Sequence, residues 1–133
     1  MCGRYTLIRL NDILERFPWI EHAPPDLLPR YNIAPTQPLL VISNDHPDRF
    51  DYYVWGLVPS WAKDPSIASR MINARAETLA EKPAFNKPLR RRRCLIPADG
   101  FYEWKPDPAG KKKGAKIPTL IRMKDHKPFA FAG

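Results

Sequence analysis

Apolar residues recur along the first half of the chain in short runs, and each run predicts one short element. Residues 7–17 have apolar positions at helical spacing and are followed by a proline, which predicts a helix that ends there. Residues 21–38 contain five prolines and predict irregular chain. The apolar run at 39–42 predicts a buried strand, and the aromatic run at 50–57 predicts its hairpin partner.

The second half predicts a further helix start and four short strands, separated by turns and by one loop rich in proline, glycine and lysine. We expect the last two strands to pair with each other around Asp125 and His126. The sequence ends inside the last apolar run, so we expect it to be part of a longer domain. The predicted elements are the helix start at 74–79, the strands at 93–97, 101–104, 117–123 and 128–132, and the loop at 105–116.

The composition is that of a globular protein with many loops. Hydrophobic residues make up 44% of 133 residues, enough for a real core, whereas 16 prolines favour short elements. No apolar run reaches the length of a membrane span and the N-terminus has no signal core, so we expect a cytoplasmic protein without membrane contact. Two cysteines and three scattered histidines predict neither a disulfide scaffold nor a metal site.

Net charge gives the first indication of a partner. The chain has 22 Lys and Arg against 14 Asp and Glu, a balance of +8, which is typical of proteins that bind a polyanion. Arg90 and Arg91 belong to a run of four arginines that could neutralise phosphates, although such runs are often only solvated surface. Trp61, in a loop beside a lysine, is the tryptophan that we expect to be exposed and able to stack on an unpaired base.

Cys2 occupies a position with special chemistry. If Met1 is removed, the chain begins with a thiol and an amine on neighbouring carbons, with ordinary pKa values of about 8.5 and about 8. Such an aminothiol condenses with an aldehyde to an imine, and the thiol then closes a five-membered thiazolidine. Arg4 nearby is expected to favour the thiolate. The alternative is that Cys2 is a small residue at a frayed terminus.

Three more polar residues are candidates for the same chemistry. Glu103 is flanked by aromatic residues and is expected to be partly desolvated, which suits general acid and base catalysis; alternatively it is a strand residue facing solvent. Asn73 and Arg75 stand on alternate positions and would share a face in extended chain. The asparagine amide could bind a sugar and the arginine a phosphate.

Taken together, these residues lie in motifs that closely resemble one family, the SOS response-associated peptidases (SRAP), also called abasic site processing proteins. The resemblance implies an α+β fold with a strongly curved, barrel-like mixed β core, flanking short helices and proline-rich loops. It covers residues 1–133, which we expect to form a single domain that is incomplete at its C-terminus. The motifs, in order, are MCGRY at 1–5, RYNIAP at 30–35, WGLVPSW at 55–61, INARAET at 72–78 and CLIPADGFYEW at 94–104.

The resemblance also implies a function in the DNA damage response. Family members lose Met1 and capture an abasic site in single-stranded DNA as a thiazolidine crosslink, without a cofactor and, we expect, as a monomer. Carried over by motif, Cys2 is the nucleophile and Schiff-base former, Asn73 holds the sugar or the amine, and Glu103 assists ring opening. DNA contacts are then expected from Arg4, Trp61, Arg75, Arg90 and Arg91.

One departure from the family pattern concerns histidine. The family has a catalytic histidine in a later segment, and this sequence ends before it. His22, His46 and His126 lie outside every matching motif, so none of them is expected to take that role.

Two other functions remain open from the residues alone. A cysteine peptidase with Cys2 as N-terminal nucleophile would cleave peptides without DNA. A single-strand binder without chemistry would keep its whole activity after Cys2→Ala.

Overall fold

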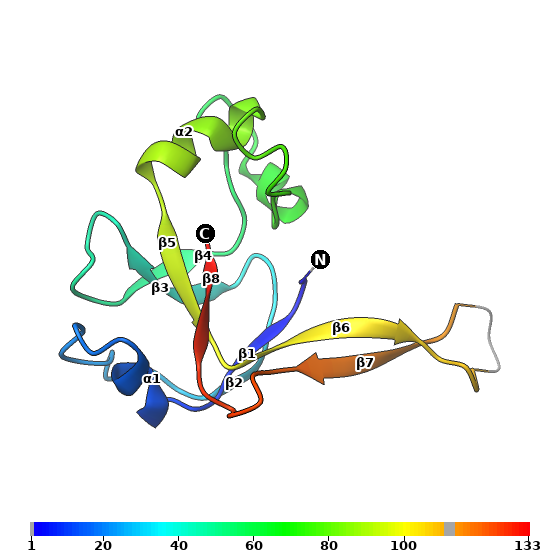
Figure 1. Cartoon of the computed structure of the whole chain (residues 1–133). Helices are drawn as coiled ribbons and strands as arrows, with labels where there is room; N and C mark the ends of the chain where they lie inside the picture. Colours follow the sequence, from blue (N-terminus) through cyan, green and yellow to red (C-terminus); the bar gives the residue numbers. More distant parts are fainter. Residues whose placement is uncertain (1, 111–113) are drawn as a thin grey trace.

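The fold consists of two antiparallel sheets of short strands with a few short helices outside them (Figure 1). The computed structural model describes residues 2–110 and 114–133. Within these residues, each sheet has four strands. The first sheet has the order β2-β1-β6-β7, made of β1 (Tyr5–Leu7), β2 (Arg30–Ile33), β6 (Gly100–Pro106) and β7 (Lys116–Ile121). The second has the order β4-β3-β5-β8, made of β3 (Pro38–Ser43), β4 (Asp51–Val54), β5 (Cys94–Ala98) and β8 (Phe129–Ala132).

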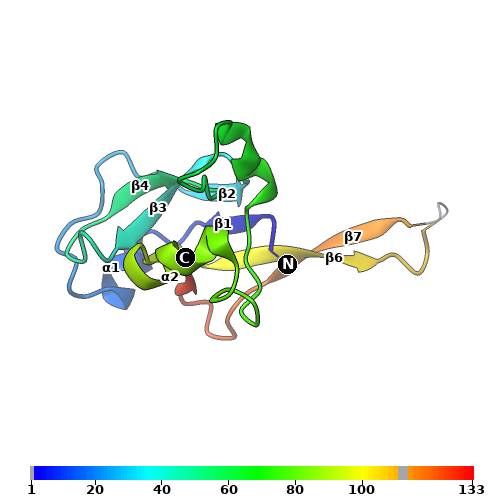
Figure 2. The same ribbon diagram turned by 90° about the horizontal axis from the view of Figure 1, so that it is seen from above.

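The helices are short and lie at the periphery of the sheets. Helix α1 (Asn11–Arg16) follows β1, whereas the 3-10 helix η1 (Pro65–Arg70) and helix α2 (Pro83–Arg91) both lie in the long excursion between β4 and β5. Figure 2 shows this excursion and the projecting β6–β7 hairpin as separate parts of the molecule. Of the helices in the described ranges, none is long and apolar enough to cross a membrane.

These observations confirm the expected α+β fold. The expected mixed core is instead antiparallel in every described pairing. Strands β1 and β5 lie against each other and bring the two sheets together, but within the described residues no ladder closes the sheets into a barrel.

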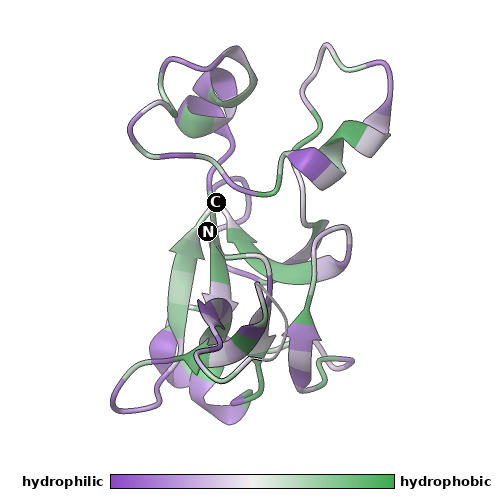
Figure 3. Cartoon of the chain, turned by 90° about the vertical axis from the view of Figure 1, so that its right-hand side faces the viewer, coloured by the Kyte–Doolittle hydropathy of each residue, from purple (hydrophilic) through white to green (hydrophobic). Residues whose placement is uncertain are grey.

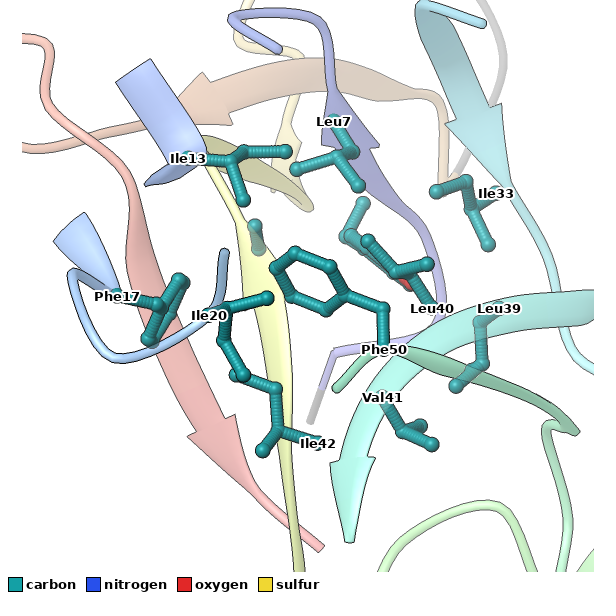
Figure 4. Packing of buried hydrophobic residues seen from close by; sticks show 12 residues of the cluster. Leu7, Ile13, Phe17, Ile20, Ile33, Leu39, Leu40, Val41, Ile42 and Phe50 are labelled. Atoms are coloured by element: carbon teal, nitrogen blue, oxygen red, sulfur yellow. The ribbon is translucent and has the colours of Figure 1, made fainter. Parts of the chain in front are cut away.

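The hydrophobic core fills the space between the sheets and α1. Hydrophobic colouring follows the strands near the two termini in Figure 3, whereas the helices and outer loops are largely hydrophilic. Burial of this apolar surface is the main stabilising contribution to the fold. The close view in Figure 4 shows side chains from α1, β1, β2 and β3 meeting there. The buried hydrophobic residues are Tyr5, Leu7, Ile13, Phe17, Ile20, Ile33, Leu39, Leu40, Val41, Ile42, Phe50 and Ala98.

A buried carboxylate organises the chain where it leaves β1. Asp99 is 6% exposed and accepts hydrogen bonds from the Thr6 hydroxyl and from the backbone amides of Ile8 and Arg9. The backbone amide of Asp99 in turn donates to the Thr6 carbonyl at 3.0 Å. These bonds tie the β5–β6 turn to β1, the strand that follows Cys2.

The first predicted helix is shorter than expected. The periodic stretch 7–17 contains Leu7, which ends β1, and only Asn11–Arg16 forms α1. Asp99 binds the two amides that follow β1, so the chain turns there before the helix begins. The prolines at 21–38 concealed β2, which pairs with β1.

The predicted helix start at 74–79 is wrong. That stretch forms turns, with the Thr78 amide donating to the Arg75 carbonyl at 3.2 Å. The helix begins instead at Pro83, because proline is tolerated in the first turn, where its missing N–H has no intrahelical role. Pro88, inside α2, costs one intrahelical hydrogen bond.

The predicted pairing of the last two strands is also wrong. Strand β7 pairs instead with β6, from Phe101–Ile121 to Pro106–Lys116, so residues 105, 106 and 116 of the predicted loop belong to strands, and its residues 111–113 lie outside the described residues. Strand β8 pairs with β5 in the other sheet. His126, with a φ of 59°, lies in the turn that carries the chain from one sheet to the other. The 39–42 and 50–57 hairpin was predicted correctly.

Candidate functional site

Cys2 lies just before β1 and is half-buried against the core. Its thiol donates a hydrogen bond to the backbone carbonyl of Arg4, with Sγ 3.4 Å from the oxygen. Burial raises the pKa of this thiol above its ordinary value and the nearby Glu103 carboxylate raises it further, whereas the backbone at Arg4 lowers it. Arg4 thus favours the thiolate through its backbone, but burial outweighs this effect, and the Arg4 guanidinium is bonded to Asn32.

Asn73 contacts the same residue from the excursion between β4 and β5. Its side-chain amide donates to the backbone carbonyl of Cys2 at 2.6 Å. The segment around it has no regular secondary structure, and both Asn73 and Arg75 are exposed. An exposed amide that is fixed on the backbone of Cys2 orients that residue while it stays within reach of a substrate.

Glu103 reaches the site from β6, in register with Thr119 of β7. Its side chain is partly buried. The carboxylate lies near enough to Cys2 to affect the thiol. The structure thus brings together three residues from separate motifs, Cys2, Asn73 and Glu103.

Arg4 lies on the rim of this cluster. Its guanidinium donates to the side-chain oxygen of Asn32 on β2 at 3.0 Å, and its carbonyl accepts from the Tyr102 amide at 2.9 Å. Strand β2 therefore holds Arg4 beside the site, with guanidinium N–H groups left to bind an anion.

The remaining predicted DNA contacts lie farther out. Trp61 is 62% exposed, which confirms the expected exposure. Arg90 and Arg91 are exposed in the last turn of α2, which stands beyond the end of β5 and apart from the chain N-terminus (Figure 1). They do not join the cluster at Cys2.

Sequence reasoning missed two residues that support the site. Asn32 holds Arg4, and the indole N–H of Trp55 donates to the Ile72 carbonyl at 2.8 Å. Both residues lie in motifs of the family resemblance, but a motif does not reveal which side chain faces which backbone atom. The expected removal of Met1 concerns a residue outside the described part of the chain.

Tyr5, on β1, carries an unusual buried hydroxyl. Within the residues that the structure describes, this hydroxyl has no hydrogen-bond partner. Burial raises the pKa of Tyr5 well above its ordinary value. The phenol ring packs edge-on against Trp55, with centroids 5.6 Å apart.

The donor set at the site suits covalent chemistry by its own side chains. Across residues 2–110 and 114–133, no group of three or more His, Cys, Asp or Glu side chains is placed to hold a metal ion. A thiol, an amide and a carboxylate are groups that can act as a nucleophile, a positioning group and a proton acceptor.

Comparison with known sequences gives a consistent result. The sequence profile of the SOS response associated peptidase (SRAP) family matches residues 1–133. The chain is 51% identical over 137 residues to the abasic site processing protein YoqW of Bacillus subtilis. This match covers 100% of this chain and 59% of the relative. The chain is 32% identical over 142 residues to the abasic site processing protein YedK of Escherichia coli. This match covers 99% of this chain and 58% of the relative. The chain thus spans about three fifths of the length of these relatives.

Solved structures share the fold. A protein from Bacteroides thetaiotaomicron superposes with a TM-score of 0.78 at 26% identity, over 98% of this chain and 58% of that one. A phage-related protein from Bordetella bronchiseptica gives a TM-score of 0.73 at 32% identity, over 98% of this chain and 59% of that one.

Proposed function

The chain belongs to the SRAP family, and from this premise we propose that it captures abasic sites in single-stranded DNA as a covalent thiazolidine crosslink through Cys2. Relatives that carry the name abasic site processing protein support the substrate. The crosslink would shield the lesion from strand cleavage.

The meeting of Cys2, Asn73 and Glu103 supports this proposal most directly. These residues come from the N-terminus, the β4–β5 excursion and β6, and the hydrogen bond between Asn73 and Cys2 spans 71 positions. A thiol at a frayed terminus would need no such partners. The arrangement is that of a reactive N-terminal residue held in one orientation.

The proposed reaction needs no oxidant and no cofactor. After removal of Met1, the Cys2 amine adds to the aldehyde carbon of the ring-opened sugar, and one water leaves as the imine forms. The thiol sulfur then adds to the imine carbon, and its proton is transferred to the nitrogen. One carbon–nitrogen and one carbon–sulfur bond replace the carbon–oxygen double bond, and the product is a closed ring.

Glu103 has a defined role in this sequence. Because burial raises the pKa of Cys2, the thiol is mostly protonated at neutral pH and ring closure needs a proton acceptor. The Glu103 carboxylate is near Cys2 and half-buried, which suits it to take the thiol proton. The same group would move a proton during opening of the sugar ring.

Basic and aromatic residues around the cluster of Cys2, Asn73 and Glu103 would hold the DNA strand. Arg4, beside the cluster, and Arg75, exposed two residues after Asn73, would bind phosphates next to the lesion. Trp61 would stack against a base. Arg90 and Arg91 would contact the same strand farther from the lesion.

Intact-protein mass spectrometry tests the proposal. The protein is mixed with a single-stranded oligonucleotide that carries one abasic site. We expect a species that lacks Met1, is joined to DNA with loss of one water and is modified at Cys2. Cys2→Ala should abolish it, whereas Cys94→Ala, which removes the other half-buried thiol, should not.

Other outcomes would contradict the proposal. A crosslink that survives Cys2→Ala would indicate an imine at another amine. An unmodified protein with Met1 removed that cleaves peptides without DNA would indicate a peptidase. Unmodified protein that only binds the oligonucleotide would indicate a binding protein.

A further inference from the structure

Trp55 is held rigidly at the point where the chain leaves β4. Its backbone amide donates to the Gln37 carbonyl at 3.0 Å, and its carbonyl accepts from the Thr36 amide at 2.9 Å. Its ring packs edge-on against buried Tyr5 at an interplanar angle of 63°. Both the backbone and the side chain of Trp55 are therefore fixed by the sheets.

The segment that Trp55 contacts has no regular secondary structure. The indole N–H donates to the carbonyl of Ile72, which directly precedes Asn73. Residues 71–75 form neither helix nor strand. A second bond supports the first, because the Leu57 amide donates to the Met71 carbonyl at 3.0 Å. These two bonds attach an irregular segment to the ordered end of β4.

Gly56 permits this close approach. Its φ is 133°, and a Cβ at this position would lie 2.6 Å from the backbone oxygen of Ala68. Any other residue would clash with the excursion and would be strained in this backbone conformation. The excursion therefore packs backbone against backbone beside Trp55.

These contacts form a closed path. It begins at Tyr5, passes through the ring and N–H of Trp55 to the Ile72 carbonyl, and continues through Asn73 to Cys2. Both ends lie in the first five residues of the chain. The position of the Asn73 amide relative to Cys2 is thus set from the β1 side and from the β4 side together.

We propose that Trp55 is a positioning residue that holds Asn73 against Cys2 through its hydrogen bond to the Ile72 carbonyl. Its effect on reaction rate rests on the function proposed above. A merely structural role would lower stability without acting through Asn73. The two roles are distinguished by whether the effect of Trp55 depends on the presence of Asn73.

The test removes the indole N–H and measures single-turnover crosslinking at saturating abasic DNA. Trp55→Phe keeps an aromatic ring for Tyr5 and deletes the donor. We expect crosslinking to slow about fivefold, the rate equivalent of one ordinary hydrogen bond. In an Asn73→Ala background, Trp55→Phe should cause no further slowing. Equal slowing in both backgrounds, or none in the wild type, would overturn the proposal.

Trp19 provides a matched control. It also packs edge-on against an aromatic ring, Phe17 at 5.7 Å, and its indole N–H also donates to a backbone carbonyl, that of Pro47 at 3.0 Å. It lies beyond the end of α1 and has no contact with the path to Asn73. Trp19→Phe should leave the rate unchanged.

Two further measurements keep the proposal testable. If Trp55→Phe does not fold, benzothienylalanine at position 55 preserves the shape of tryptophan and replaces N–H by sulfur. If the wild-type protein forms no crosslink, the proposed function fails, but NMR signals of the Asn73 side-chain amide still test the positioning. Loss of the Trp55 donor should shift and broaden these signals, and unchanged signals would refute the proposal.

Discussion

The side-chain amide of Asn73 donates to the backbone carbonyl of Cys2 at 2.6 Å. This bond connects the irregular excursion between β4 and β5 to the N-terminal residue whose amine and thiol carry the proposed chemistry. It fixes the backbone of Cys2 without engaging the thiol, which donates instead to the Arg4 carbonyl.

Replacing Asn73 by aspartate should impair the reaction strongly. The carboxylate has no donor and repels the Cys2 carbonyl, so we expect Asn73→Asp to slow crosslinking roughly 10- to 100-fold. Single-turnover gel assays at saturating abasic DNA measure this rate. Asn86→Asp is the matched control, because the Asn86 amide also donates to a backbone carbonyl at 2.6 Å, that of Ala80. An Asn73→Asp variant with the wild-type rate would contradict the assigned role.

The reactivity of Cys2 should increase with pH. Its pKa is raised, so more of the thiol is protonated at neutral pH than in a free cysteine, and alkylation should be slow there. We expect the midpoint, the pH at which the alkylation rate reaches half of its maximum, to be higher than for a free thiol. Iodoacetamide labelling followed by mass spectrometry, in a Cys94→Ala background, measures it.

Glu103→Gln should move that midpoint to lower pH, because it removes a negative charge that disfavours the thiolate. Glu15→Gln, on the exposed side of α1, should leave the midpoint in place. An unchanged midpoint in the Glu103 variant would show that this carboxylate does not act on the thiol.

Arg75 should bind a phosphate of the DNA strand. Arg75→Ala should weaken binding to single-stranded DNA that carries a tetrahydrofuran abasic analogue, which has no aldehyde. The dependence of log affinity on log salt should become shallower by about 0.7 for each phosphate that is no longer neutralised. Fluorescence anisotropy over a salt series measures both effects, with Arg16→Ala in α1 as the control.

Combined replacement of Arg90 and Arg91 by alanine tests the more distant part of the surface. If the bound DNA strand extends to α2, the slope of log affinity against log salt should become shallower by about 1.4, twice the effect of one neutralised phosphate. An unchanged slope would limit the DNA footprint to the surroundings of Cys2.

Asp99 should be essential for stability. Asp99→Ala leaves the Ile8 and Arg9 amides without their acceptor and leaves the Thr6 hydroxyl only its longer bond to the Gly100 carbonyl, so we expect a loss of about 3 kcal/mol in the free energy of unfolding. Urea unfolding monitored by tryptophan fluorescence measures it. Asp48→Ala, on an exposed turn, should change stability by no more than about 0.5 kcal/mol. A small effect for Asp99→Ala would mean that water replaces the carboxylate.

Much of the fold could be predicted because short apolar runs specify short strands locally. The β3–β4 hairpin and the β6–β7 hairpin follow from neighbouring runs joined by turns. The partner of β8 could not be predicted, because β5 lies far from it in sequence and only the three-dimensional arrangement brings them together. Strand β2 was concealed by the prolines around it.

The site was predictable to the same extent. Cys2 follows from the chemistry of an N-terminal aminothiol, whereas the roles of Asn73 and Glu103 come from the family resemblance. The mutual orientation of these residues could not be predicted. The Asn73 amide and the Trp55 indole N–H both donate to backbone carbonyls. Backbone acceptors are the same at every position, so no sequence pattern identifies them.

The excursion between β4 and β5 contributes Asn73 yet buries little. Neither η1 nor α2, both fully within the described residues, contains a buried residue, whereas β3 is almost wholly buried. Segments that bury little apolar surface open at lower free energy than the sheets that support them. Amide hydrogen exchange should therefore be faster in the excursion than in β3 and β5. Local opening of the excursion would then expose the surroundings of Cys2 from one side, while β1, which follows Cys2, stays folded.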